Sequence, residues 1–269
     1  MEVLGYVASI AIGLALGLIG GGGSILTLPV LVYLFAVPVV LATTYSLFVV
    51  GITALIGSIS FYRQKLIDIR IFFVFGIPSI IAVFVTRLYL VPLIPEVVFR
   101  VGAFVMTKDM FIMGVFATLM IGAAYGMLRP TNQKEAAGKA TTSLVPQKIN
   151  YPLVLLEGTV VGGVTGLVGA GGGFLIIPAL VFIGKLPMKV AVGTSLLIIA
   201  AKSLFGFFAE FSEIAIDWVL LTIVSLFAVL GMFIGTLLSK RIEGEKLKPI
   251  FGWFTLVMGI YILIKEFFN

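Results

Sequence analysis

Long apolar runs, separated by short polar stretches, extend along the whole chain. In the first half they cover residues 3–19, 24–35, 41–62, 71–93 and 110–128, and in the second half 152–168, 174–184, 190–209, 218–238 and 249–267. Most approach the ~20 apolar residues that a helix needs to cross a bilayer. The pattern therefore predicts an all-α polytopic membrane protein with about five hydrophobic segments in each half.

The two halves repeat one another. The stretch GLIGGGGSILTLP from Gly17 aligns without a gap with GLVGAGGGFLIIP from Gly166, at an offset of 149 residues. The same offset pairs Pro38 with Pro187 and, further along, Ser46 with Ser195 and Asp68 with Asp217. Matches that keep one register over this length indicate an internal duplication.

The duplication divides the chain into three parts. Residues 1–128 form the first transmembrane repeat and residues 151–269 the second. Residues 129–150 between them are polar and contain several lysines and a proline near each end, which is typical of a solvated linker. We expect this linker to be cytoplasmic.

The first two segments of each half cannot form one straight helix. Residues 3–35 would extend roughly 50 Å at 1.5 Å per residue, whereas the hydrocarbon core is about 30 Å thick. Glycine runs at residues 20–23 and 169–173 interrupt the two pairs at equivalent places. Each half is therefore predicted to open with a bent or re-entrant pair of helices, broken at a glycine-rich turn.

Composition agrees with a membrane protein and limits the chemistry. Hydrophobic residues make up 61% of the chain and charged residues 11%, and the mean hydropathy is +1.23. The chain has no cysteine and no histidine, so we expect no metal site, no cofactor and no catalytic residues. Glu2, with no basic residue before the first apolar run, favours a retained first span over a signal peptide.

Charge placement predicts the topology. With five segments per half, the linker and the loops at residues 63–70, 185–189 and 240–248 share one side, and they hold most of the 18 basic residues. By the positive-inside rule that side is cytoplasmic, and no nucleic-acid site is implied. The loop with Glu210 and Glu213 falls outside although its equivalent is basic, which indicates inverted repeats. The alternative is eight spans in parallel repeats.

The glycine turns are candidate anion sites, because bare backbone N–H groups at a helix start attract negative charge. Helices that start near residues 24 and 174 would direct their positive ends at one point near the midplane. The alternative is that these glycines only permit close helix packing. The candidate residues in the two turns are Gly20, Gly21, Gly22, Gly23 and Ser24, and Gly169, Gly171, Gly172 and Gly173.

Lys202 is the second candidate, because a charge at bilayer depth is costly without a partner or a wet cavity. The partner could be a substrate anion, or the lysine could pair with Glu157 or Glu210 or snorkel. Hydroxyls on the same segment and on its repeat equivalent could add donors, or could bond their own helices. They are Thr194, Ser195, Tyr45 and Ser46.

Other charged residues are given structural roles. We expect Arg87 to snorkel toward the outer face and Glu157 to be an interfacial anchor, with a gate or a proton carrier as its alternative. Asp68 and Asp217 are expected to stabilise equivalent helix ends.

The duplicated glycine-proline motif, together with P-x-x-x-A-V-G-T-S-L at residues 187–196, resembles the TauE/SafE sulfite exporter family, also called the 4-toluene sulfonate uptake permeases. The resemblance covers nearly the whole chain. It implies a secondary transporter, an exporter, of a small anion such as sulfite or an organosulfonate in the inner cell membrane, with protons as a candidate coupling ion. A passive anion channel is the alternative, and a membrane-embedded enzyme is disfavoured because no span carries paired aspartates or a metal cluster.

Overall fold

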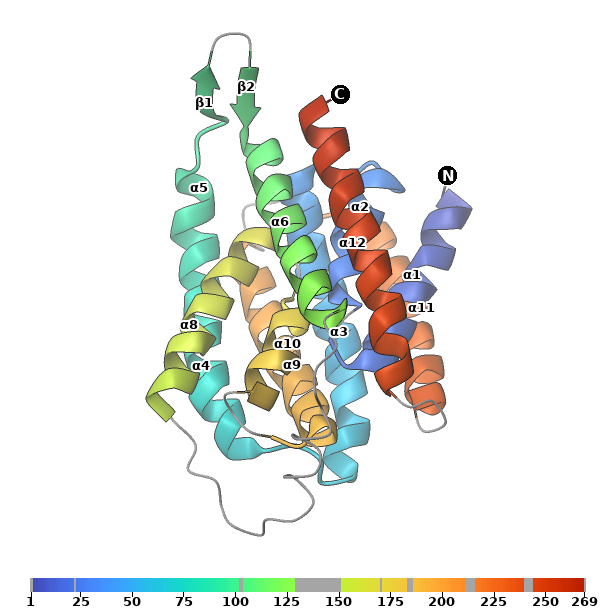
Figure 1. Ribbon diagram of the computed structural model, residues 1–269. Coiled ribbons are helices and arrows are strands. Elements are labelled where there is room, and N and C mark those ends of the chain that lie inside the picture. The colour runs from blue at the N-terminus through green and yellow to red at the C-terminus, as the bar shows by residue number, and fades with distance from the viewer. Residues whose placement is uncertain are drawn as a thin grey trace.

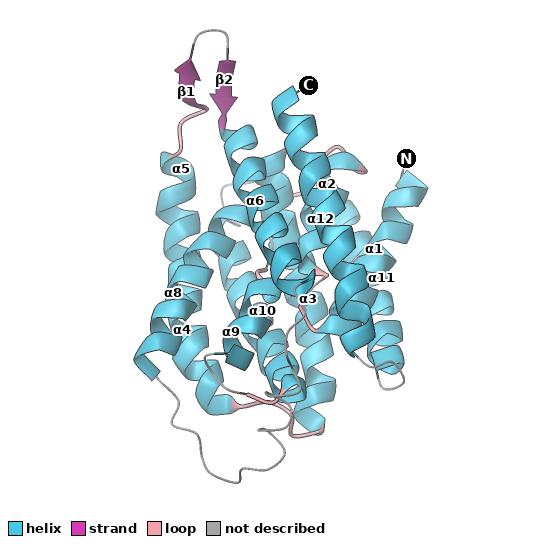
Figure 2. Cartoon of the chain, in the orientation of Figure 1, coloured by secondary structure: helices cyan, strands magenta, loops and turns pink. Residues whose placement is uncertain are grey.

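The computed structural model of the chain describes residues 2–21, 23–101, 104–128, 151–169, 171–182, 186–210, 216–239 and 244–268. Within these ranges the chain is a bundle of helices with one short β-hairpin at one end (Figures 1 and 2). The predicted linker at residues 129–150 and the positions Gly22, Ala170 and Glu213 lie outside the described residues.

The helices follow the apolar runs closely. The first half contains α1 (Glu2–Ile19), α2 (Ser24–Tyr33), α3 (Val39–Arg63), α4 (Ile69–Val85), the π-helical turn η1 (Thr86–Leu90), α5 (Val91–Leu93) and α6 (Lys108–Leu128). The second half contains α8 (Tyr151–Val168), α9 (Gly173–Phe182), α10 (Met188–Glu210), α11 (Trp218–Ser239) and α12 (Gly244–Phe268). The all-α class is confirmed, and so are both predicted breaks at the glycine turns.

One element was not predicted. Strands β1 (Val97–Val101) and β2 (Phe104–Thr107) form an antiparallel hairpin between α5 and α6. Figure 1 shows it extending beyond the helix ends. The hairpin lies in a stretch that the second half does not repeat, so the repeat alignment contained no information about it.

Five helices in the described part of the chain are long and apolar enough to cross a membrane. They are Val39–Arg63, Ile69–Leu93, Lys108–Gly126, Met188–Glu210 and Trp218–Leu238. Shorter apolar helices cover Val3–Leu18, Ser24–Tyr33 and Pro152–Val168, and each of these adjoins a glycine turn. Large apolar side chains remain exposed on the outer faces, for example Phe73, Ile77 and Ile81 of α4. Lipid is the solvent that suits such a surface.

Two of the loops between helices end at an aspartate that caps the next helix. The Asp68 carboxylate accepts hydrogen bonds from the N–H groups of Arg70 and Ile71, at 2.9 and 3.1 Å. Asp217 does the same for Val219 and Leu220, each at 3.0 Å. The predicted helix-end role of the two aspartates is therefore confirmed.

The main helix pairs join one half to the other. Helix α1 packs along α11, and α8, the repeat equivalent of α1, packs along α4, the equivalent of α11. Glycines permit the close approach, since a β-carbon on Gly158 or Gly162 would lie 2.5 Å from a backbone oxygen of α4. The remaining main pairs, α3 with α10 and α6 with α12, each join two equivalent helices.

Helices α3 and α10 run antiparallel through the centre of the bundle. Thr44, near the start of α3, bonds Glu210 at the end of α10. At the other end, Gly193 near the start of α10 lies against Phe61 near the end of α3. Helices α3 and α10 are equivalent by the 149-residue offset. The two halves therefore contribute equivalent central helices that run in opposite directions beside the glycine turns.

Candidate functional site

The second glycine turn, between α8 and α9, has a backbone that favours glycine. Gly169, Gly171 and Gly172 have φ angles of +72°, +63° and +67°, in the left-handed region that side chains with a β-carbon rarely adopt. Within the described residues, no hydrogen bond takes up the N–H groups of Gly171 and Gly173. The turn therefore offers bare backbone donors at the start of α9, as predicted for an anion site.

The first glycine turn, between α1 and α2, differs from the second. Gly20 has a φ of +79°, but Gly23 has an ordinary helical φ of −66°. Gly23 lies where a β-carbon would meet Leu16 of α1, and Ser24 donates its hydroxyl back to the carbonyl oxygen of Gly21, at 2.8 Å. Close packing therefore explains much of this turn.

The two turns lie against one another. A β-carbon on Gly21 would fall 2.6 Å from the carbonyl carbon of Gly173. The backbone of each turn thus forms part of the surroundings of the other, which agrees with the expectation that both turns approach one point.

Lys202 adjoins the second turn. Its side chain is fully buried, so it does not snorkel, and its Nζ donates to Thr165 Oγ1 of α8 at 2.8 Å. A β-carbon on Gly172 would lie 2.8 Å from this nitrogen. No carboxylate of the described residues pairs with Lys202. Glu210 pairs with Arg87 instead, and one carboxylate oxygen of Glu157 has no hydrogen-bond partner there.

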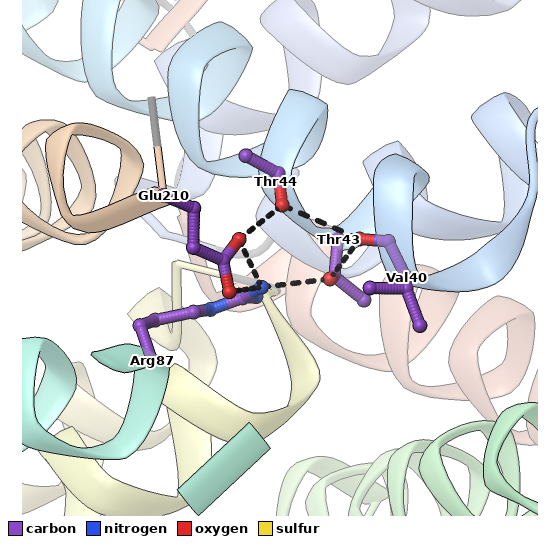
Figure 3. A network of polar contacts seen from close by, with 5 residues as sticks. All are labelled: Val40, Thr43, Thr44, Arg87 and Glu210. Carbon is purple, nitrogen blue, oxygen red and sulfur yellow. Dashed lines mark hydrogen bonds and ion pairs between the residues drawn. The ribbon is translucent and has the colours of Figure 1, made fainter. Parts of the chain in front are cut away.

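The prediction for Arg87 is wrong. Arg87 lies in η1 and is fully buried, with Nη1 donating to Thr43 Oγ1 at 2.9 Å and to a Glu210 oxygen at 3.2 Å. Figure 3 shows the guanidinium directed at Glu210, with Thr43 and Thr44 completing the group. Thr44 donates its hydroxyl to Glu210 Oε2, the same oxygen that Arg87 approaches most closely. A charged partner on α10 offsets part of the desolvation cost of burying the guanidinium.

Arg87 keeps unused donors on the side of the glycine turn. Its Nε and Nη2 have no hydrogen-bond partner among the described residues. A β-carbon on Gly169 would lie 2.6 Å from Nη2. Gly169 and Gly172, three residues apart, are thus flanked by two buried cations, Arg87 and Lys202, which both have donors to spare.

A cavity of about 210 Å³ opens beside the ion pair. Its lining includes Arg87 and Glu210 on one side and Lys108 and Pro92 on the other. The cavity lies toward the end of the bundle that carries the hairpin, since Pro92 lies in α5 and Lys108 begins α6, the two helices that flank the hairpin. The Arg87–Glu210 pair therefore lies between this cavity and the second glycine turn.

The predicted hydroxyl residues lie in different surroundings. The Asp68 N–H donates to Thr194 Oγ1 at 2.9 Å, and the Asp217 N–H donates to the Tyr45 hydroxyl at 2.6 Å. The two bonds are equivalent by the repeat offset, and each ties one half to the other. Ser195 donates to its own helix at 2.8 Å and contacts the Gly20 carbonyl at 3.3 Å. Ser46 is buried, with no partner for its hydroxyl within the described residues.

Sequence reasoning missed Arg87, Glu210, Thr43 and Thr165 as parts of this site. One signal could have found the ion pair: in the predicted topology, opposite charges lie near the outer ends of the segments 71–93 and 190–209. Thr43 and Thr165 gave no signal, because a membrane-embedded threonine usually bonds its own helix.

Residues 6–262 of the chain match the family described as sulfite exporter TauE/SafE. The chain belongs to this family. It is 30% identical over 268 residues to a probable membrane transporter protein of Xylella fastidiosa (strain Temecula1 / ATCC 700964), covering 95% of this chain and 92% of the relative. The probable membrane transporter protein YunE of Bacillus subtilis (strain 168) is 25% identical over 99% of this chain and its own full length. No solved structure matches the chain.

Membership of the TauE/SafE family confirms the resemblance in the glycine-proline motifs. It also identifies the chain as a multi-pass membrane transporter and not an enzyme, since the family and these relatives are named as exporters or transporters.

Proposed function

We propose that this TauE/SafE protein is a secondary transporter of a small sulfur oxyanion, such as sulfite or an organosulfonate. The anion binds at the second glycine turn, between Arg87 and Lys202. The observation that carries this proposal is the pair of fully buried cations with unused donors at one bare backbone turn.

The chemistry of the donors suits an oxyanion. The Nε and Nη2 edge of a guanidinium can bind two oxygens of one sulfonate group in parallel. The Lys202 ammonium, bonded to Thr165, has protons left for a third oxygen. Backbone N–H groups at Gly171 and Gly173 add the positive end of α9. An uncompensated buried ammonium is costly, so a bound anion would stabilise it.

Under this proposal, the candidate residues from the sequence have different roles. Gly169, Gly171, Gly172, Gly173 and Lys202 form the anion site. Gly21 and Ser24 form its neutral wall, Gly20 and Gly23 are assigned to helix packing, and Gly22 lies outside the described residues. Ser46 and Ser195 are retained as nearby hydroxyls. Tyr45 and Thr194 hold the two halves together through backbone N–H groups instead.

We also propose that the halves are inverted repeats that alternate around this site. The antiparallel α3 and α10, and the equivalent bonds at Asp68 and Asp217, support a twofold relation with its axis in the membrane plane. With the basic loop after α3 in the cytoplasm of an inner membrane, the hairpin end faces outward. Export is then a step from the turn past Arg87 into the outer cavity, with protons as the proposed coupling ion.

Flux in proteoliposomes tests this function. We expect radiolabelled sulfite and methanesulfonate to move with saturable kinetics and to compete with one another, without ATP. Flux that rises linearly with concentration, together with steady single-channel current, would support the passive channel instead. Absence of flux for every sulfur oxyanion, with well-folded protein, would refute the proposed substrate class.

A further inference from the structure

We infer that Glu210 sets the charge of the transported anion, so that the site carries a monoanion in preference to a dianion. The inference rests on the proposed anion site at the second glycine turn and concerns its selectivity. It follows from the buried charges around that turn.

The charges at the turn do not cancel. Arg87 and Lys202 bring two positive charges, both fully buried, and Glu210 brings one negative charge on a side chain that is 9% exposed. The site is left with one excess positive charge. Buried charge is costly unless it is balanced, so one negative charge on the substrate gives the most stable occupied state.

Glu210 and the substrate can occupy Arg87 at the same time. Glu210 contacts Nη1, whereas Nε and Nη2 have no partner among the described residues and Nη2 adjoins Gly169. The substrate therefore does not need to displace the carboxylate. Glu210 stays in the occupied site, and its charge counts against that of the substrate.

Few other charged groups of the described residues face Glu210. Helix α3 presents the hydroxyls of Thr43 and Thr44, and η1 presents Arg87. Across the cavity α6 presents Lys108, which is half-buried at the cavity lining. Lys202 lies on the same helix, toward the glycine turn. Lys108 is followed by Asp109, an opposite charge that interacts with it, so the balance is set by the buried Arg87, Lys202 and Glu210. With these three groups, a dianion would leave one excess negative charge.

The test uses two probes whose charge does not change near neutral pH. Methanesulfonate is a monoanion and thiosulfate a dianion throughout this range. In proteoliposomes of the wild-type protein near neutral pH, we expect methanesulfonate flux to saturate at a lower concentration than thiosulfate flux. In Glu210→Gln, which keeps hydrogen bonds to Arg87 and Thr44, this preference for the monoanion should weaken or reverse. The affinity for thiosulfate relative to methanesulfonate should rise by roughly tenfold or more, as expected for one unit charge removed at close range.

Two variants make the result specific. Glu210→Asp keeps the negative charge and should keep the wild-type selectivity. Glu157→Gln removes another carboxylate within the helices, away from this pair, and should not change the selectivity. An unchanged thiosulfate-to-methanesulfonate ratio in Glu210→Gln overturns the inference while the transport function stands. If that variant does not fold, equal affinities of the wild-type protein for the two probes overturn it as well. A wild-type protein that carries neither probe overturns the proposed function itself.

Discussion

Replacing Lys202 with methionine removes one buried charge while nearly preserving the volume of the side chain. At about 4 Å and an effective dielectric constant near 20, a unit positive charge attracts a bound monoanion by ~4 kcal/mol. This corresponds to a loss of roughly 1000-fold in affinity. The structure supports a contact of this kind, because Nζ adjoins the backbone of Gly172. Saturable flux in proteoliposomes should therefore disappear over the accessible substrate range.

Stability should respond in the opposite sense to activity. The only hydrogen bond of the Lys202 side chain to a described residue goes to Thr165, and no carboxylate of that part of the chain pairs with it. Removing an unpaired buried charge should leave the melting temperature in detergent unchanged or raise it.

The matched control for this variant is Lys265→Met on α12, where Nζ lies 3.9 Å from the ring centroid of Tyr33, and this variant should transport normally. Lys202→Arg should restore little, because a planar guanidinium does not fit the space beside Gly172. Wild-type affinity in well-folded Lys202→Met would refute the reasoning.

Three further outcomes are expected. Gly172→Ala should lower the free energy of unfolding by about 1 kcal/mol or more, since its φ is +67°, and should lower substrate affinity, since the methyl group would meet Lys202. Calorimetry and flux measurements should therefore both change. Tyr45→Phe and Thr194→Val should each cost about 1 kcal/mol of stability while leaving substrate affinity unchanged, as thermal unfolding and binding assays would reveal. Single cysteines at Gln64 and Glu213, in a chain without native cysteine, should react from opposite sides of the membrane; labelling from one side contradicts inverted repeats.

The helices were predictable because membrane solvation imposes a simple rule. Every backbone group in the hydrocarbon must bond internally, so an apolar run of sufficient length forms a helix. The breaks at the glycine turns followed from the length of the apolar stretches, which is too great for one straight helix across the hydrocarbon core. The aspartate caps at Asp68 and Asp217 followed from their place before a helix. These features depend on local sequence, and the structure has each of them.

The ion pair could not be derived in this way. Whether Arg87 turns toward the headgroups or toward the interior depends on which helix faces it. The apolar run that contains Arg87 carries no information on its orientation. The π-helical turn η1, which shifts the direction of side chains within an otherwise regular helix, also has no sequence signature in this run. Packing between elements distant in sequence decides both features, and the partner Glu210 lies 123 residues away.

The repeat finally explains why the proposed site has only one charged turn. The repeat equivalents of the groups around the second turn are all uncharged, and two of them, Val192 and Leu16, lie against the first turn. The equivalents are Val192 for Thr43, Leu16 for Thr165, Thr53 for Lys202 and Thr236 for Arg87. The threonine hydroxyls at positions 53 and 236 both bond the carbonyl oxygens of their own helices, at 2.6 and 2.8 Å. Because the two turns are in contact, cations at both would repel one another and would require two anions. Under the proposed function, a neutral first turn leaves one binding site, whose single excess charge is determined by Arg87, Lys202 and Glu210.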